Sequence, residues 1–269
     1  MILASWRLLA SIVKRCEVIL EVLDARDPIS TRSRKLERMV EKENKKLILV
    51  LNKCDLIPRH VAEKWKRIFS GEGYTTVYMA ARDHKGTRVL RRTIKMIAPS
   101  LPTVVGVVGF PKTGKSTIIN ALKGRHSATT SSIPGSPGYT KKAQLYRIDR
   151  NIYMIDTPGI IPVEGGPLEA VIRGKPPEQL DDPVKPAMML LERALKYNPY
   201  CVLEAYGIKE RNPLKILEAI ARHRGWFYKT TGEPLIEEAA KCVIRDYHEG
   251  KLLFYVPPEE YIALKRKKN

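Results

Sequence analysis

A glycine-rich loop that ends in a lysine and a hydroxyl residue is the part of this 269-residue sequence best suited to chemistry. The segment GFPKTGKS (109–116) matches the pattern G-x-x-x-x-G-K-[ST] and lies between a strand pattern and a helix pattern. Backbone N–H groups of such a loop close around phosphate oxygens, the lysine reaches the β- and γ-phosphates, and the hydroxyl binds Mg²⁺. The pattern therefore predicts a nucleotide site with Lys115 on the phosphates and Ser116 on the metal.

Almost the whole loop is expected to touch the nucleotide. Thr117 follows at the start of the helix, where a backbone N–H contacts the α-phosphate. The alternative is a glycine-rich turn with no ligand, which the strand and helix on either side disfavour. The predicted phosphate-loop residues are Gly109, Pro111, Lys112, Thr113, Gly114, Lys115, Ser116 and Thr117.

A second motif, NKCD (52–55), predicts recognition of guanine. The Asp55 carboxylate would accept hydrogen bonds from N1–H and the 2-amino group, a donor pair that adenine lacks. Asn52 would tie this segment to the phosphate loop, and the Lys53 stem would cover the base. The backbone N–H of Ala81, after the next strand, would contact the guanine carbonyl. Asn-Lys is also ordinary turn chemistry, so the motif gains its meaning from the phosphate loop.

A third group of residues could hold Mg²⁺ and sense the γ-phosphate. DTPG (156–159) ends a strand pattern. Asp156 would bind Mg²⁺ through a water, and the Gly159 N–H would sense the γ-phosphate. Thr140 would complete the metal shell with Ser116 and Asp156, the alternative being a plain strand residue. Lys115, Thr140 and Gly159 are thus the candidate catalytic residues.

The elements that carry these motifs alternate between strands and helices, which predicts an α/β domain with a mainly parallel sheet. Asp149–Arg150 reads as the turn of a hairpin that joins the last two strands. Strands are predicted at 16–24, 46–52, 75–80, 103–109, 141–148 and 151–156, and helices at 31–44, 58–69, 87–98 and from 115.

The motif order is unusual. In ordinary GTPases the phosphate loop comes first and the N-K-x-D motif later, whereas here residue 52 precedes residue 109 and DTPG follows at 156. The order predicts a circularly permuted phosphate-loop GTPase domain, because a chain break moved to a surface loop leaves the same sheet to assemble.

A second domain is expected after the nucleotide motifs. The Gly- and Pro-rich segment 157–187 reads as a switch loop and linker. Helical patterns punctuated by proline follow, so we predict a GTPase domain over 1–183 and a small all-α domain over 184–269. The basic end, KRKKN, is expected to be disordered.

Composition limits the partners and the compartment. The formal net charge of +19 indicates a polyanionic partner, either nucleic acid or an acidic membrane face. The four cysteines form no C-x-x-C pair, which predicts neither a zinc site nor a disulfide framework and favours a reducing, cytoplasmic location. No apolar run reaches 18 residues. The first 16 residues have helical apolar spacing, which favours a core-packed amphipathic helix over a signal peptide.

With these motifs in place, the sequence resembles the YlqF/YawG family of circularly permuted GTPases. LDARDP (23–28) resembles that family's D-A-R-x-P signature, PGSPGYT (134–140) its P-G-x-T switch, and EEAAKCVIRDYHEGKL (237–252) its C-terminal domain. The resemblance implies GTP or GDP with Mg²⁺ as ligands, and GTP hydrolysis during large ribosomal subunit maturation. It also implies helical contacts to rRNA or ribosomal protein, and neither membrane nor DNA as a partner. The alternatives are a non-hydrolysing GTP-dependent RNA-binding module and a membrane-surface GTPase.

Three departures from the usual pattern bear on catalysis. Ile160 stands where many GTPases have a water-orienting Gln, which predicts slow intrinsic hydrolysis. Lys112 replaces an Asn that helps relatives hold K⁺, so either its ammonium supplies that charge or it is a solvated lysine. In bacterial relatives an N-terminal His is proposed to assist catalysis; of the five histidines of this sequence only His126 lies near the switch, and it reads as a surface residue. For Asp24 and Arg26, a functional contact and a structural ion pair both remain open.

Overall fold

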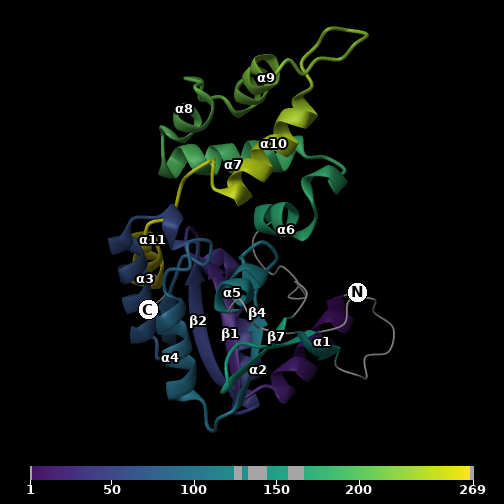
Figure 1. Ribbon diagram of the computed structural model, residues 1–269. Coiled ribbons are helices and arrows are strands. Elements are labelled where there is room, and N and C mark those ends of the chain that lie inside the picture. The colour runs from purple at the N-terminus through teal and green to yellow at the C-terminus, as the bar shows by residue number, and fades with distance from the viewer. Residues whose placement is uncertain (1, 124–128, 133–143, 157–166, 267–269) are drawn as a thin grey trace. The chain divides into compact units, whose positions relative to one another are not determined.

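The computed structural model describes residues 2–123, 129–132, 144–156 and 167–266 (Figure 1). It divides into two compact units, Met1–Glu164 and Gly165–Asn269. This division lies 19 residues before the predicted domain boundary after residue 183, which stays a prediction.

The first unit is built on a seven-stranded sheet of order β3-β2-β1-β4-β7-β6-β5. The five strands from β3 to β7 in this order are parallel, and β6 and β5 continue the sheet antiparallel. The α/β fold with a mainly parallel sheet is therefore confirmed. The strands are β1 Val18–Asp24, β2 Lys46–Asn52, β3 Thr75–Tyr78, β4 Thr103–Val108, β5 Thr129–Ser132, β6 Gln144–Arg147 and β7 Ile152–Asp156.

The central strands are mostly apolar because helices cover both faces of the sheet. Ile19 of β1 packs with Leu9 and Leu36 on one face, which α1 and α2 cover. On the other face, Leu20 packs with Leu90 and Ile118, which α4 and α5 contribute. The helices of this unit are α1 Ile2–Arg15, α2 Arg34–Lys42, α3 Arg59–Gly71, α4 Thr87–Ile97 and α5 Lys115–Leu122.

The parallel register brings the sequence motifs to one edge of the sheet. Asp24 pairs with Asn52 at the ends of β1 and β2, and Val107 pairs with Asp156 near the ends of β4 and β7. The phosphate loop begins directly after β4. All three predicted motifs therefore start from the carboxyl edge of the sheet, where ligands bind in open α/β folds.

The second unit is helical and has its own core. Leu191, Ile216 and Val243 are fully buried in it. The helices are α6 Pro167–Gly174, α7 Val184–Tyr197, α8 Cys201–Tyr206, α9 Pro213–His223, α10 Ile236–Glu249 and α11 Pro258–Arg266.

Two local expectations were wrong. The segment predicted as loop and linker over 157–187 contains α6 and the first turn of α7, because Leu168 and Ile172 of α6 are buried in the helical core. Lys265 and Arg266, predicted as part of a disordered tail, form the last turn of α11. The remaining residues of that tail, 267–269, lie outside the described part of the chain.

Candidate functional site

The phosphate loop adopts the backbone that its two end glycines permit. Gly109 has φ +152° and Gly114 has φ +97°, both in the region where a side chain is strained. A Cβ on Gly109 would lie 2.5 Å from the Val22 carbonyl oxygen, and a Cβ on Gly114 would lie 2.2 Å from Asn52 Nδ2. Both positions favour glycine because of their backbone angles, and because an added Cβ would meet backbone at Gly109 and the Asn52 side chain at Gly114.

Lys115 is held inside the loop that it is predicted to serve. The residue is buried, and its Nζ donates to the carbonyl oxygens of Gly109 at 3.0 Å and Phe110 at 2.7 Å. Phe110 itself packs in the core below, and Thr113 Oγ1 donates to the Phe110 carbonyl at 2.9 Å. The ammonium therefore sits within the ring of backbone that would surround a phosphate, which fits the predicted role.

Asn52 joins the phosphate loop to the predicted guanine-reading loops. Its Nδ2 donates to the Thr113 carbonyl at 3.0 Å, and its Oδ1 accepts from the Ala81 N–H at 3.1 Å. The predicted tie between NKCD and the phosphate loop is thus present. The Ala81 N–H already serves this tie, so a guanine carbonyl would have to share it with Asn52. Its contact with guanine stays a prediction.

Lys53 is positioned by an ion pair with Asp24 that sequence reasoning did not predict. Its backbone is left-handed at φ 65°, and its Nζ lies 3.1 Å from Asp24 Oδ2. Arg26 donates two hydrogen bonds to the same carboxylate, from Nε to Oδ1 at 3.0 Å and from Nη2 to Oδ2 at 2.9 Å. Asp24 is 0% exposed and Arg26 1%. The D-A-R segment therefore holds the N-K-C-D lysine from the neighbouring strand.

The register of β1 and β2 explains why this contact was missed. Asp24 and Lys53 are 29 positions apart, and they meet because Asp24 pairs with Asn52 across the two strands. A signal was available: both motifs follow apolar strands at the same relative position, and parallel neighbours end at the same edge.

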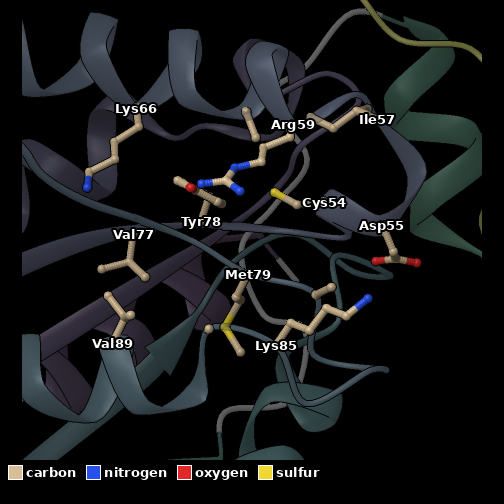
Figure 2. Close-up of a pocket in the computed structure, with 13 residues that line it drawn as sticks. Cys54, Asp55, Ile57, Arg59, Lys66, Val77, Tyr78, Met79, Lys85 and Val89 are labelled. Atoms are coloured by element: carbon tan, nitrogen blue, oxygen red, sulfur yellow. The ribbon is translucent and has the colours of Figure 1, made fainter.

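Asp55 lies beside a pocket of about 540 Å³ between α3, β3 and α4. Figure 2 shows Asp55 and Lys85 at one side of the pocket, away from the apolar side chains of Val77 and Val89. Asp55 is exposed, in a short 3₁₀ turn after β2. The Cys54 N–H donates to the Met79 carbonyl at 3.1 Å, which fixes this turn against β3. The carboxylate is thus presented at the sheet edge, where a base can reach it.

Cys54 contributes packing rather than reactivity. Burial raises the pKa of its thiol to about 12, and Sγ donates to the Leu51 carbonyl at 3.4 Å. A thiol protonated at neutral pH is a poor nucleophile.

The predicted metal ligands are only partly described. Ser116 is exposed in the first turn of α5, after the phosphate loop, and Asp156 ends β7, the strand that pairs with β4. Their roles as Mg²⁺ ligands stay a prediction. Thr140, Gly159 and Ile160 lie outside the described residues, as does His126. Pro111 and Lys112 are half-buried in the loop, with Lys112 at φ 63°, and Thr117 is exposed.

Comparison with known proteins identifies relatives along nearly the whole chain. A GTP-binding protein of Methanocaldococcus jannaschii is 37% identical over 93% of this chain. Nucleolar GTP-binding protein 2 of Yarrowia lipolytica is 35% identical over 95% of it, and the guanine nucleotide-binding protein-like 3 homolog of Caenorhabditis elegans is 32% identical over 93%. The chain spans 66%, 51% and 50% of the lengths of these three relatives.

Solved structures share the fold over both units. YlqF from Thermotoga maritima, in its GNP-bound form, superposes with a TM-score of 0.67 at 25% identity. The match covers 94% of this chain and 98% of YlqF, and the GDP-bound form gives 0.64. The expected likeness to YlqF is therefore confirmed.

The family model described as RsgA GTPase matches residues 7–164, which contain every predicted nucleotide motif. The phosphate loop, the Asn52 tie and the Asp55 turn lie at the sheet edge that this match spans, in the permuted order that the sequence predicted. The chain thus belongs to the RsgA GTPase family.

Proposed function

We propose that this chain hydrolyses GTP to GDP and phosphate, slowly on its own, and does so on a precursor of the large ribosomal subunit. The observation that carries the nucleotide-binding part is the pair of hydrogen bonds by which Asn52 connects the phosphate loop to the guanine-reading loops through Thr113 and Ala81. One side chain thereby sets the distance between the phosphate site and the base site.

Each residue of the site has a role in this proposal. Lys115 moves its ammonium from the loop carbonyls to the β- and γ-phosphates, and N–H groups of the loop from Gly109 to Thr117 hold the other oxygens. Asp55 reads guanine, and Lys53, held by Asp24, covers the base. Gly159 senses the γ-phosphate through its N–H.

Mg²⁺, with Ser116, Asp156 and Thr140 as its ligands, would neutralise charge on the β- and γ-phosphates. This set is supported by chain position, since Asp156 ends β7, the strand that pairs with β4, and Ser116 follows the phosphate loop after β4. Lys112 is the candidate for supplying the charge that K⁺ supplies in relatives with Asn at this position, with a solvated lysine as the alternative.

The ribosomal part of the proposal has two supports. Relatives from eukaryotes bear nucleolar names, and the net charge of +19 suits an RNA-rich particle. No helix in the described part of the chain is long and apolar enough to cross a membrane. A cytoplasmic location stays a prediction, as does the absence of a DNA partner.

The test is GTP turnover with and without large ribosomal subunits. We expect slow basal turnover, stimulation by the subunits, and loss of turnover in Lys115→Ala. Lys46→Ala is the matched control, since this exposed lysine lies at the opposite end of β2. Stimulation absent at every salt concentration would refute the coupling.

A non-hydrolysing GTP-dependent RNA-binding module is the second candidate, favoured by Ile160 in place of a water-orienting Gln. It predicts tight GTP binding, no turnover, and RNA affinity that depends on bound GTP. Wild-type protein with no turnover under any condition would establish this candidate over the first.

A further inference from the structure

Two neighbouring aromatic side chains are exposed on the helical unit. The segment 224–235, here called the aromatic loop, connects α9 to α10. Within it Phe227 is 39% exposed and Tyr228 43%, whereas Trp226 packs against the helical core. Exposed aromatic residues cost free energy in water, so a neighbouring pair of them marks a candidate contact surface.

The aromatic loop is held by its own backbone. Trp226 donates its N–H to the Ala221 carbonyl and accepts from the Leu235 N–H, both at 2.9 Å. The Tyr228 N–H donates to the Glu233 carbonyl at 2.9 Å, and the Gly232 N–H returns to the Tyr228 carbonyl at 2.9 Å. The two aromatic rings are therefore presented by an ordered turn, which lowers the entropy cost of binding.

Basic residues dominate the sequence around these rings. Arg222, Arg224 and Lys229 lie within seven positions of one another, and the one acidic residue of the aromatic loop is Glu233, whose carbonyl accepts from the Tyr228 N–H. The Arg224 guanidinium lies 5.2 Å from the centre of the Trp226 ring. His223 and Arg224 also line a pocket of about 210 Å³ with Tyr206 and Ile220. A partner for this surface must offer both flat apolar faces and negative charge.

We propose that the aromatic loop binds an unpaired stretch of RNA. Two bases would stack on Phe227 and Tyr228, while Arg222, Arg224 and Lys229 contact the phosphates between them. Unpaired nucleotides are favoured over a duplex because base faces are accessible only when they are unstacked. The proposal rests on the proposed function for the source of the RNA, the ribosomal particle.

The test uses the full chain and a fluorescent 12-nucleotide RNA without secondary structure. Fluorescence anisotropy gives its affinity at one fixed salt concentration. Phe227→Ala and Tyr228→Ala should each weaken binding about tenfold, the scale of one lost base stack. Phe227→Tyr and Tyr228→Phe should retain most of the affinity, because stacking needs the ring. Lys229→Glu, at an exposed position, should weaken RNA binding. It should leave the thermal unfolding transition of the protein unchanged.

Tyr200→Ala is the matched control. Tyr200 is 65% exposed in the same unit, yet the three residues on either side of it include no lysine or arginine. Its loss should leave RNA affinity unchanged. A duplex of the same sequence should bind more weakly than the single strand.

Wild-type affinity in the double variant Phe227→Ala/Tyr228→Ala would overturn the proposal and would assign the surface to a protein partner instead. Equal binding of duplex and single strand would also overturn it. GTP turnover, measured on the same variants without ribosomal subunits, should stay at the wild-type value. If the wild-type protein showed no GTP turnover, the proposed hydrolysis would be refuted. RNA binding by the aromatic loop would not be, since oligonucleotide binding does not depend on hydrolysis.

Discussion

Lys53 shares the Asp24 carboxylate with Arg26, so a residue of the guanine-reading loop depends on a strand that does not carry that loop. Asp24→Asn removes the charge that holds the Lys53 Nζ and leaves two cations facing a neutral amide. We expect GDP affinity to fall about tenfold and stability to fall by about 3 kcal/mol. Fluorescent GDP titration and thermal unfolding would measure the two effects.

The control for this prediction is a double-mutant cycle. Lys53→Met should weaken GDP binding by a similar factor, and adding Asp24→Asn to it should weaken binding little further, because the two residues act as a pair. Strictly additive losses of GDP affinity would show that Asp24 does not act through Lys53.

Gly114 is the position in the phosphate loop with the least room. Gly114→Ala would place a methyl group 2.2 Å from Asn52 Nδ2 on a backbone of φ +97°. We expect nucleotide binding to be lost, because either the loop or the Asn52 tie must move. Gly174→Ala is the matched control, since nothing lies within 4 Å of its added Cβ. Normal GDP affinity in Gly114→Ala would mean that the tie is not needed for binding.

Among the elements, β1 carries a carboxyl group where its neighbours are apolar. Glu21 is fully buried, and its Oε1 accepts from the Ser33 N–H at 2.6 Å, ahead of α2. Burial raises the pKa of Glu21 to about 8, the Glu37 carboxylate adds to the rise, and Arg32 and Arg34 oppose it. The folded protein therefore holds this proton at neutral pH.

The pH dependence follows from that raised pKa. A proton bound more tightly in the folded state stabilises the protein fully below about pH 4.5, and this stabilisation is lost as the pH rises through about 8. Glu21→Gln should flatten the fall in stability between pH 5 and pH 9, with chemical unfolding as the measurement. A fall equally steep in wild type and variant would assign it to other groups.

The sequence predicted best the strands whose residues are mostly apolar, because such composition indicates burial. β2 and β4 have apolar interiors, β1 is apolar except for Glu21 and its last residue, and the structure buries all three between two helical layers. β5, with the sequence TTSS, has no such pattern and forms a strand by pairing with β6. The short helix α6 lies between Gly- and Pro-rich stretches, and its two buried anchors, Leu168 and Ile172, become visible only when the helical core is assembled.

The residues of the candidate site also differ in how far the sequence predicts their positions. Asn52 and Lys115 belong to motifs whose spacing is local, so their positions in the two loops were predictable from the chain alone. The ion pair between Asp24 and Lys53 depends on which strands are neighbours and in what register, and a single sequence does not state this.

On the scale of the whole molecule, the charge is uneven along the chain. Residues 1–185 hold 33 basic and 18 acidic residues, whereas residues 186–269 hold 15 and 11. We expect affinity for large ribosomal subunits to fall more than tenfold between about 50 and 200 mM salt, through counterion release. GDP affinity over the same range, as the control, should change far less. A flat salt response of subunit binding would mean that the charge of the nucleotide unit does not face RNA.

The permuted motif order also fixes the sequence of events during synthesis of this chain. The strands β1, β2 and β3 emerge before β4, so the Asn52 oxygen can meet the Ala81 N–H while the Asn52 amide nitrogen still lacks the Thr113 carbonyl. The base-reading half of a nascent chain therefore emerges first, and the phosphate half emerges last. A GTPase with the ordinary motif order emerges the other way round, with its phosphate loop made before the base-reading loops.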